Sequence, residues 1–167
     1  ITGIDTRELT KVLHEHGVMM GKIVFDDEPG NVPEATYAGI NYVDKVSCKE
    51  VIRYNEGAGK KKVVLVDCGV KTNIIRCLLK RDVEVIRVPW NHDFTGMEYD
   101  GLFISNGPGD PDTCDEAVQH IRKAMSLSDK PIFGICMGNQ LLSKAGGATI
   151  YKLKYGHRSH NQPVRMI

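Results

Sequence analysis

The chain has 167 residues, of which 41% are hydrophobic and 26% charged, and this composition is ordinary for one full globular core with part of a second. The 22 basic and 21 acidic residues leave a formal net charge of +1, and no basic stripe is interleaved with aromatic residues, so we expect no nucleic-acid partner. No apolar run approaches the roughly 20 residues that cross a bilayer, so we also expect no membrane association.

The first expected element is a helix at residues 3–17, "GIDTRELTKVLHEHG". Asp5 can accept hydrogen bonds from the first turn and Glu8 stands three residues later, as in a capping box. Gly17 suits the end of the helix. A short apolar run at residues 22–25 then predicts a strand.

Residues 26–62 show no periodic pattern and are rich in Pro, Gly, Asn and charged side chains. This composition is typical of a connection between two units. The sequence therefore predicts a domain boundary near Gly59, which divides the chain into residues 1–59 and residues 60–167.

From residue 63 onward, strand patterns alternate with helix patterns. The run "VVLVD" is typical of a strand buried on both faces, and "NIIRCLLKR" follows with apolar residues at helical spacing. This alternation predicts an α/β fold, a parallel sheet with helices on both faces. The expected strands are 63–67, 83–88, 101–105 and 131–135, and the expected helices are 73–81, 115–125 and 137–147.

A cysteine framed by glycines, Gly134-x-Cys136-x-Gly138, has the spacing of a nucleophile elbow with sulfur in place of the serine oxygen. Cys136 ends a strand and opens a helix, where the terminal N–H groups and the helix dipole favour a thiolate. The alternative is a buried structural cysteine. The glycine frame at a strand-to-helix turn favours the nucleophile.

The other four cysteines, Cys48, Cys68, Cys77 and Cys114, lack such a frame and are expected to be structural. The odd number of cysteines and the absence of a C-x-x-C pair argue against a disulfide framework, and they indicate a reducing compartment.

The turn "NGPGDP", residues 106–111, follows the third of these strands, as Cys136 follows the fourth. Ligands bind outside the carboxyl ends of parallel strands. The glycines of this turn can bring backbone N–H groups close to a ligand, as an oxyanion hole requires. The sequence thus predicts that both segments contribute to one site.

Other motifs predict no further chemistry. The run "GAGKKK" lacks the spacing and the hydroxyl of a phosphate-binding loop. No pair of histidines has the helical i, i+4 metal spacing with an acidic partner, so we expect no metal site. His157 and His160 remain as a weak alternative, either as a metal pair or as a base for Cys136.

Taken together, "SNGPGDP" and "FGICMGNQLL" resemble the class I glutamine amidotransferases. The whole chain resembles the glutaminase side of carbamoyl-phosphate synthetase, which includes "GIDTRELT", "VDCGVKTNIIR" and "YKLKYGHRSHNQPV". The resemblance implies a flavodoxin-like amidotransferase domain at residues 60–167. It also implies that residues 1–59 are the end of the small-subunit N-terminal domain with a linker.

By position, the resemblance implies that Cys136 attacks the side-chain amide of glutamine. The main-chain N–H groups around Gly107 and Met137 would stabilise the oxyanion, Gly109 would line the pocket and Gln140 would hold the substrate. Ammonia would leave, and water would hydrolyse the γ-glutamyl thioester to glutamate. The implied partner is a synthetase large subunit or a fused synthetase portion, which would use ATP, Mg²⁺ and bicarbonate. No cofactor is expected in this chain.

Two departures from the family pattern stand out. The elbow reads Cys-Met-Gly-Asn-Gln where the family usually has Cys-Leu-Gly-His-Gln. This elbow sequence resembles the urea-cycle branch of the family. The resemblance suggests a mitochondrial location, with a cytoplasmic one as the alternative. The family's catalytic histidine and glutamate lie in a downstream motif that this chain does not reach. We therefore expect little glutaminase activity from the chain alone.

Two other functions stay open. A non-catalytic amidotransferase-like domain would support a synthetase that uses free ammonia. An unrelated cysteine hydrolase of α/β type would have a different loop in place of "NGPGDP".

Overall fold

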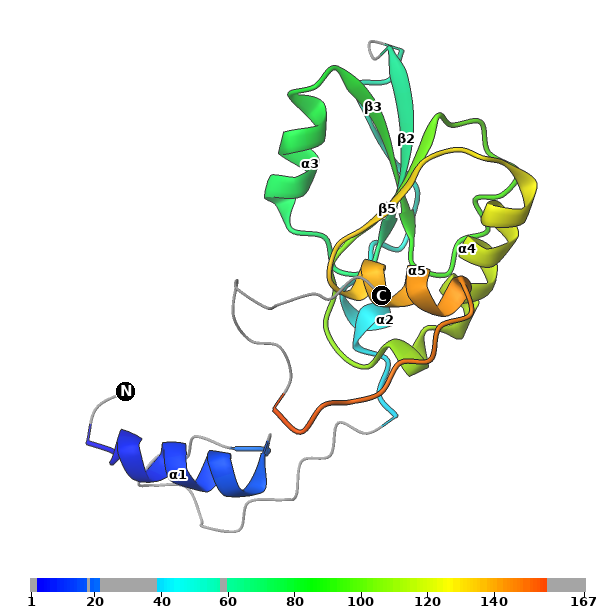
Figure 1. The fold of residues 1–167 in the computed structure, drawn as a ribbon. Coiled ribbons are helices and arrows are strands. Elements are labelled where there is room, and N and C mark those ends of the chain that lie inside the picture. Colours follow the sequence, from blue (N-terminus) through cyan, green and yellow to red (C-terminus); the bar gives the residue numbers. More distant parts are fainter. Residues whose placement is uncertain (1–2, 18, 22–38, 58–59, 156–167) are drawn as a thin grey trace. The chain divides into compact units, whose positions relative to one another are not determined.

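A computed structural model describes residues 3–17, 19–21, 39–57 and 60–155 (Figure 1). The chain forms two compact units, one made of Ile1–Thr36 with Tyr151–Ile167 and the other of Tyr37–Ile150. The strand expected at 22–25 and the two histidines at 157 and 160 lie outside the described residues.

The first unit contains α1 (Thr6–His16), which begins where the sequence predicted. Asp5 caps it by accepting from the N–H groups of Arg7 and Glu8, at 3.0 and 2.9 Å. The second half of the capping box is not made, because Glu8 pairs with Lys11 instead, at 2.9 Å. Tyr155 donates to the carbonyl oxygen of His14 at 2.7 Å, so residues 151–155 pack with α1.

The second unit is built on a five-stranded sheet in the order β1-β3-β2-β4-β5. Its strands are β1 (Ile52–Tyr54), β2 (Lys61–Asp67), β3 (Val83–Pro89), β4 (Gly101–Ile104) and β5 (Ile132–Gly134). The last four are parallel and follow the flavodoxin-like order, as predicted. The sheet is mixed, however, because β1 pairs antiparallel with β3.

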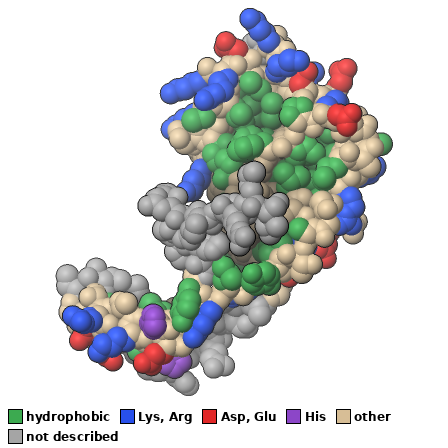
Figure 2. Space-filling model, in the orientation of Figure 1, with side chains coloured by type: hydrophobic (Ala, Val, Ile, Leu, Met, Phe, Trp, Pro, Cys, Tyr) green, Lys and Arg blue, Asp and Glu red, His purple; other side chains and the backbone are tan. Residues whose placement is uncertain are grey.

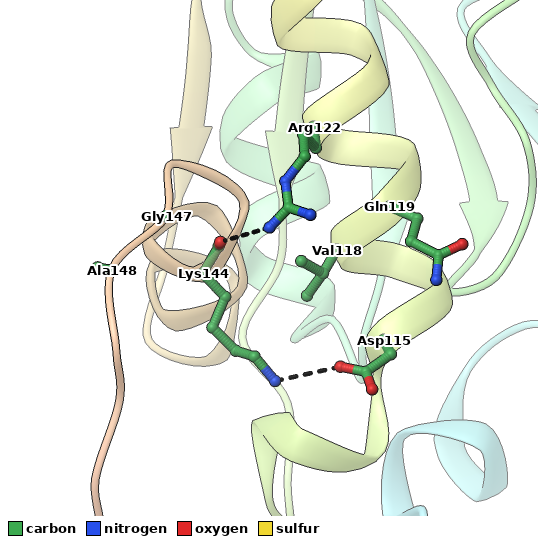
Figure 3. A pocket seen from close by; sticks show the side chains of 7 residues that line it. All are labelled: Asp115, Val118, Gln119, Arg122, Lys144, Gly147 and Ala148. Carbon is green, nitrogen blue, oxygen red and sulfur yellow. Dashed lines mark hydrogen bonds and ion pairs between the residues drawn. The ribbon is translucent and has the colours of Figure 1, made fainter.

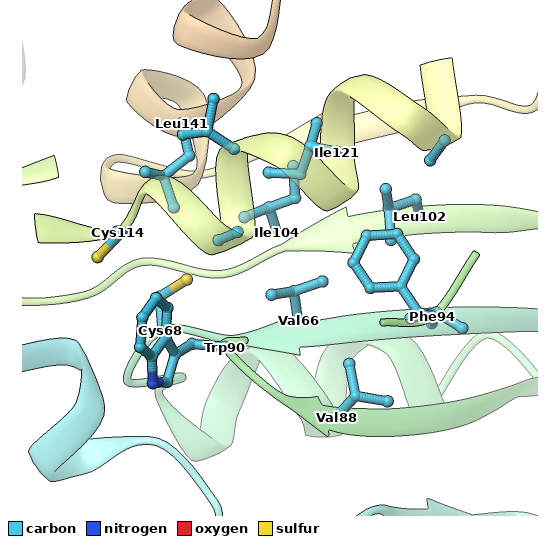
Figure 4. Close-up of a cluster of buried hydrophobic side chains, with 14 of the residues drawn as sticks. Val66, Cys68, Val88, Trp90, Phe94, Leu102, Ile104, Cys114, Ile121 and Leu141 are labelled. Carbon is cyan, nitrogen blue, oxygen red and sulfur yellow. The ribbon is translucent and has the colours of Figure 1, made fainter. Parts of the chain in front are cut away.

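Helices cover both faces of this sheet, as the sequence predicted (Figure 1). On one face, α3 (Thr72–Leu79) packs Ile75 against Leu65 and Val85. On the other face, α4 (Asp115–Leu127) and α5 (Met137–Ala145) enclose the larger core (Figure 4). That core includes Val66, Cys68, Val88, Trp90, Phe94, Leu102, Ile104, Cys114, Ile121 and Leu141.

The segment that the sequence assigned to a connection contains regular structure among its described residues. It forms α2 (Tyr42–Val46) and the edge strand β1, and both belong to the sheet unit. The Asn41 side chain caps α2 and donates to the carbonyl oxygen of Thr113 at 2.9 Å. The boundary predicted near residue 59 therefore does not coincide with an edge of this compact unit, since tertiary contacts hold the preceding residues to the sheet.

Part of the sheet on the α3 side carries exposed apolar side chains. Phe133 on β5 is 60% exposed, and its ring lies 5.4 Å from that of Phe103 on β4. Figure 2 shows hydrophobic side chains gathered over this unit. Among the described helices, none has both the length and the apolar character needed to cross a membrane.

Candidate active site

The predicted elbow lies at the carboxyl edge of the sheet. Cys136 follows β5 and directly precedes α5, with backbone angles φ 53° and ψ −108°. A positive φ is uncommon for a residue with a β-carbon. Cys136 is exposed, and its side chain makes no capping bond to α5.

Two glycines make this sharp turn possible because the backbone passes too close for a side chain. A β-carbon at Gly134 would lie 2.5 Å from the carbonyl carbon of Gly138. A β-carbon at Gly138 would overlap the carbonyl oxygen of Ile104. The glycine frame noted in the sequence is therefore required by the packing of β5, α5 and β4.

Strand register places the three loops of the site side by side. Val66, Ile104 and Gly134 stand in one row across β2, β4 and β5. The loops that follow these strands therefore leave the sheet at the same edge. The N–H of Gly138 donates to the carbonyl oxygen of Ser105 at 3.0 Å, which ties the elbow to the loop after β4.

The loop after β4 carries Gly107, which was predicted to stabilise the oxyanion, and Gly109, which was predicted to line the pocket. Gly107 lies against the loop after β2, because a β-carbon there would overlap the carbonyl oxygen of Cys68. Gly109 has a φ of +87° and lies beside Tyr42 of α2. Met137 is the first residue of α5, where N–H groups have no helical carbonyl partner.

Met137 and Gln140, the two α5 residues predicted to serve the site, have side chains in different surroundings. Met137 is 2% exposed and belongs to the core, so only its backbone can serve the site. Gln140 lies in the first turn of α5 with its side chain exposed. The fold thus gathers Cys136 and Gly107 at one sheet edge, and it leaves the Gln140 side chain at the surface of α5.

The structure adds a residue that the sequence did not single out, Asp67 at the end of β2. Its side chain is completely buried. One oxygen accepts from the N–H groups of Gly69 and Val70 at 2.9 and 2.8 Å. The other accepts from the N–H of Cys48 at 2.8 Å and from Arg87 at 2.6 and 2.9 Å.

Burial by itself raises the pKa of Asp67, but these backbone N–H groups and Arg87 outweigh burial and hold that pKa below its usual value. The carboxylate therefore stays charged and fixes the turn that follows β2. Its only signal in the sequence is a charged residue that closes an apolar strand.

The cysteines differ sharply in their surroundings. Burial raises the pKa of Cys48 to about 11, with Asp67 adding to the shift, and burial also raises the pKa values of Cys68 and Cys114. These three thiols stay protonated at neutral pH, and of them Cys68 and Cys114 are buried while Cys48 is half-buried. Cys77 on α3 and Cys136 are exposed.

Iodoacetamide is accordingly expected to alkylate Cys136 and Cys77 in the folded protein because both are exposed. The other three thiols are expected to stay unmodified, because the thiolate is the reacting species and burial keeps them protonated. Peptide mass spectrometry after a short treatment measures the modified fraction of each cysteine. Equal labelling of Cys68 and Cys136 under native conditions would contradict the burial described above.

A pocket between α4 and α5 is lined by charged side chains that are engaged in hydrogen bonds and ion pairs (Figure 3). Lys144 pairs with Asp115 at 3.2 Å, and Arg122 donates to the carbonyl oxygen of Lys144 at 3.1 Å. These contacts hold the two helices together. Within the described residues, no group of three or more His, Cys, Asp or Glu side chains is arranged to hold a metal ion.

The family model of "Glutamine amidotransferase class-I" matches residues 64–166, which is more than half of the chain. The chain belongs to this family. A solved structure agrees with this class I amidotransferase fold: a putative GMP synthase subunit from Thermoplasma acidophilum aligns with a TM-score of 0.52 and 28% identity. The alignment covers 58% of this chain and 50% of that one.

Curated relatives of this amidotransferase chain match nearly its whole length. "Multifunctional protein CAD" of Squalus acanthias is 48% identical over 98% of this chain and 7% of its own length. "Carbamoyl-phosphate synthase [ammonia], mitochondrial" of Homo sapiens is 46% identical over 100% and 11%. "Carbamoyl phosphate synthase small chain" of Pyrococcus furiosus is 46% identical over 98% and 46%. The chain thus spans less than half the length of these relatives.

The two animal relatives match at nearly the same identity, so the predicted likeness to the urea-cycle branch stays a prediction. The relatives include both a mitochondrial enzyme and an archaeal small chain, so the similarity is compatible with either predicted compartment.

Proposed function

We propose that this chain supplies the glutamine-hydrolysing part of a carbamoyl-phosphate synthetase, with Cys136 as the nucleophile. The observation that carries the proposal is an exposed cysteine at φ 53°, held at the carboxyl edge of a class I amidotransferase sheet beside a glycine turn. Relatives named as carbamoyl-phosphate synthase small chains support the assignment.

In the proposed reaction, the Cys136 thiolate attacks the side-chain amide carbon of L-glutamine. The N–H groups of Gly107 and Met137 stabilise the negative charge that develops on the carbonyl oxygen. The C–N bond then breaks, the nitrogen takes up a proton and leaves as ammonia, and a γ-glutamyl thioester remains on Cys136. Water attacks the thioester, which releases glutamate and restores the thiol.

Among the described residues, no histidine hydrogen-bonds to the Cys136 thiol. We therefore place the general base outside the described part of the chain. Ammonia passes to a synthetase partner, either a separate large subunit or a fused portion, where ATP, Mg²⁺ and bicarbonate are used. This chain itself needs no cofactor for the hydrolytic step.

The assembled protein, with its synthetase portion present, is expected to make carbamoyl phosphate from L-glutamine and to carry radiolabel from [¹⁴C]glutamine on Cys136 after an acid quench. The label is expected because the thioester is covalent and lies between two chemical steps. Peptide mapping locates the label. Synthesis from ammonia alone, with no labelled peptide, would contradict the proposal.

That contrary result would favour a second function, a non-catalytic domain that supports an ammonia-fed synthetase. The observation in favour of this second function is the human relative whose name specifies ammonia. The exposed thiol at the elbow is the observation against it.

A further inference from the structure

We propose that Asn106 is a positioning residue for the oxyanion-stabilising N–H of Gly107. The inference rests on the proposed glutaminase function and assigns a role to a side chain that does not itself touch the substrate. It is carried by a pair of hydrogen bonds between the loop after β4 and the loop after β2.

The side-chain amide of Asn106 makes two hydrogen bonds to the loop after β2, one as donor and one as acceptor. Its Nδ2 donates to the carbonyl oxygen of Gly69 at 3.1 Å, and its Oδ1 accepts from the N–H of Lys71 at 3.3 Å. Asparagine offers a neutral donor and a neutral acceptor on separate atoms of one side chain. The two bonds bracket a single residue, Val70, and so fix both the distance and the orientation of one loop against the other.

The loop after β2 that Asn106 contacts is held by further hydrogen bonds. Asp67 holds its turn by accepting from the N–H groups of Gly69 and Val70. A β-carbon at Gly69 would lie 2.9 Å from Val46 and 3.1 Å from Pro108, so this turn packs closely against both residues. The amide of Asn106 therefore connects the segment before Gly107 to a turn that Asp67 holds.

Ser105 fixes the same segment from its other side. Its Oγ accepts from the N–H of Cys68 at 2.9 Å and donates to the carbonyl oxygen of Asn106 at 2.8 Å. The carbonyl oxygen of Ser105 accepts from Gly138 in the elbow. Gly107 thus follows directly after two residues that are bonded to the loops on both sides, and Asn106 is the chain neighbour of the proposed oxyanion donor.

The test is Asn106→Asp in the assembled protein. Aspartate keeps the shape and the acceptor for Lys71, but it loses the donor to Gly69 and faces that carbonyl with a second acceptor. A small displacement of an oxyanion donor is expected to lower kcat for glutamine hydrolysis by about 10- to 100-fold. The KM for glutamine is expected to stay within about twofold, because the misplaced contact is made in the transition state.

Inhibition by the γ-aldehyde of glutamate reports the same contact, because the thiol adds to it and forms an oxyanion-like thiohemiacetal. Its inhibition constant is expected to rise by the same factor as kcat falls. The matched control is Asn91→Asp on the loop after β3, where Asn91 is exposed, and this variant is expected to behave as the parent. Ammonia-dependent synthesis is expected to be unchanged in both variants.

Asn106→Ala removes both bonds without adding a charge and is expected to lower kcat at least as far. A parent-like kcat in both Asn106 variants would overturn the inference. Loss of ammonia-dependent synthesis, or a KM that rises as kcat falls, would also overturn it, because either result indicates a general structural role. A parent protein that does not hydrolyse glutamine would instead reject the proposed function itself.

Discussion

Replacing Cys136 by serine is expected to abolish the use of glutamine while leaving synthesis from ammonia intact. The loss in glutamine-dependent kcat is expected to be about 10⁴-fold or more. An alcohol is a much weaker acid than a thiol, so serine at this turn would remain protonated and would not attack an amide at neutral pH. Serine is close in size to cysteine, so the elbow itself is expected to form.

The matched control is Cys77→Ser, because Cys77 is the other exposed cysteine and lies on α3, outside the elbow. This variant is expected to keep its activity with both glutamine and ammonia. Steady-state rates with glutamine and with ammonium chloride, measured side by side, separate the outcomes. Glutamine use that survives in Cys136→Ser would show that this thiol is not the nucleophile, and loss of both activities would indicate a structural role.

The second large effect is expected on stability, from Asp67→Asn. The substitution places an amide nitrogen where Cys48 and Arg87 now donate, and it leaves the Arg87 guanidinium, 21% exposed, without its carboxylate. Breaking a buried ion pair by removing one partner costs roughly 3–5 kcal/mol. Amide hydrogen exchange of β2 and β3 in the assembled protein is expected to show a loss of this size in the free energy of opening.

Asp112→Asn is the control, because Asp112 pairs with Lys144 at 2.7 Å but its side chain is 69% exposed. Exposed pairs contribute little, so exchange in β2 and β3 is expected to stay as in the parent. Equal protection in the Asp67 variant and the parent would show that the pair makes no net contribution to the stability of the sheet.

The depressed pKa of Asp67 also sets the pH range of this contribution. The unfolded chain has an Asp pKa near 3.9, and the folded value lies lower. The stabilisation is therefore complete above about pH 4 and is lost as the pH falls through the folded pKa. The difference in protection between the parent and Asp67→Asn is expected to shrink over that acidic range.

Much of the sheet unit could be predicted from local pattern. β2 is a continuous β-branched run, α4 and α5 have apolar residues at helical spacing, and the glycines around Cys136 mark a tight turn. Such signals lie within a few neighbouring residues and need no knowledge of the rest of the chain. The family resemblance then connected the elbow to glutamine chemistry.

The parts that were missed depend on distant partners. α2 has five residues and β1 three, too few for a periodic signal, and they form because Val43 is buried and β1 pairs with β3. Asp67 owes its role to Arg87, twenty residues away. The hydrogen bonds of Asn106 with Gly69 and Lys71 likewise join loops that only the strand order brings together.

The backbone at Cys136 has a consequence for protein engineering. A φ of 53° with ψ of −108° is a conformation that glycine adopts freely and that costs other residues on the order of 1–3 kcal/mol. Selection for thermal tolerance alone would therefore favour glycine at this position and would discard the thiol. At this residue stability favours glycine and the proposed activity requires cysteine. Any screen for more thermostable variants therefore needs to measure turnover as well.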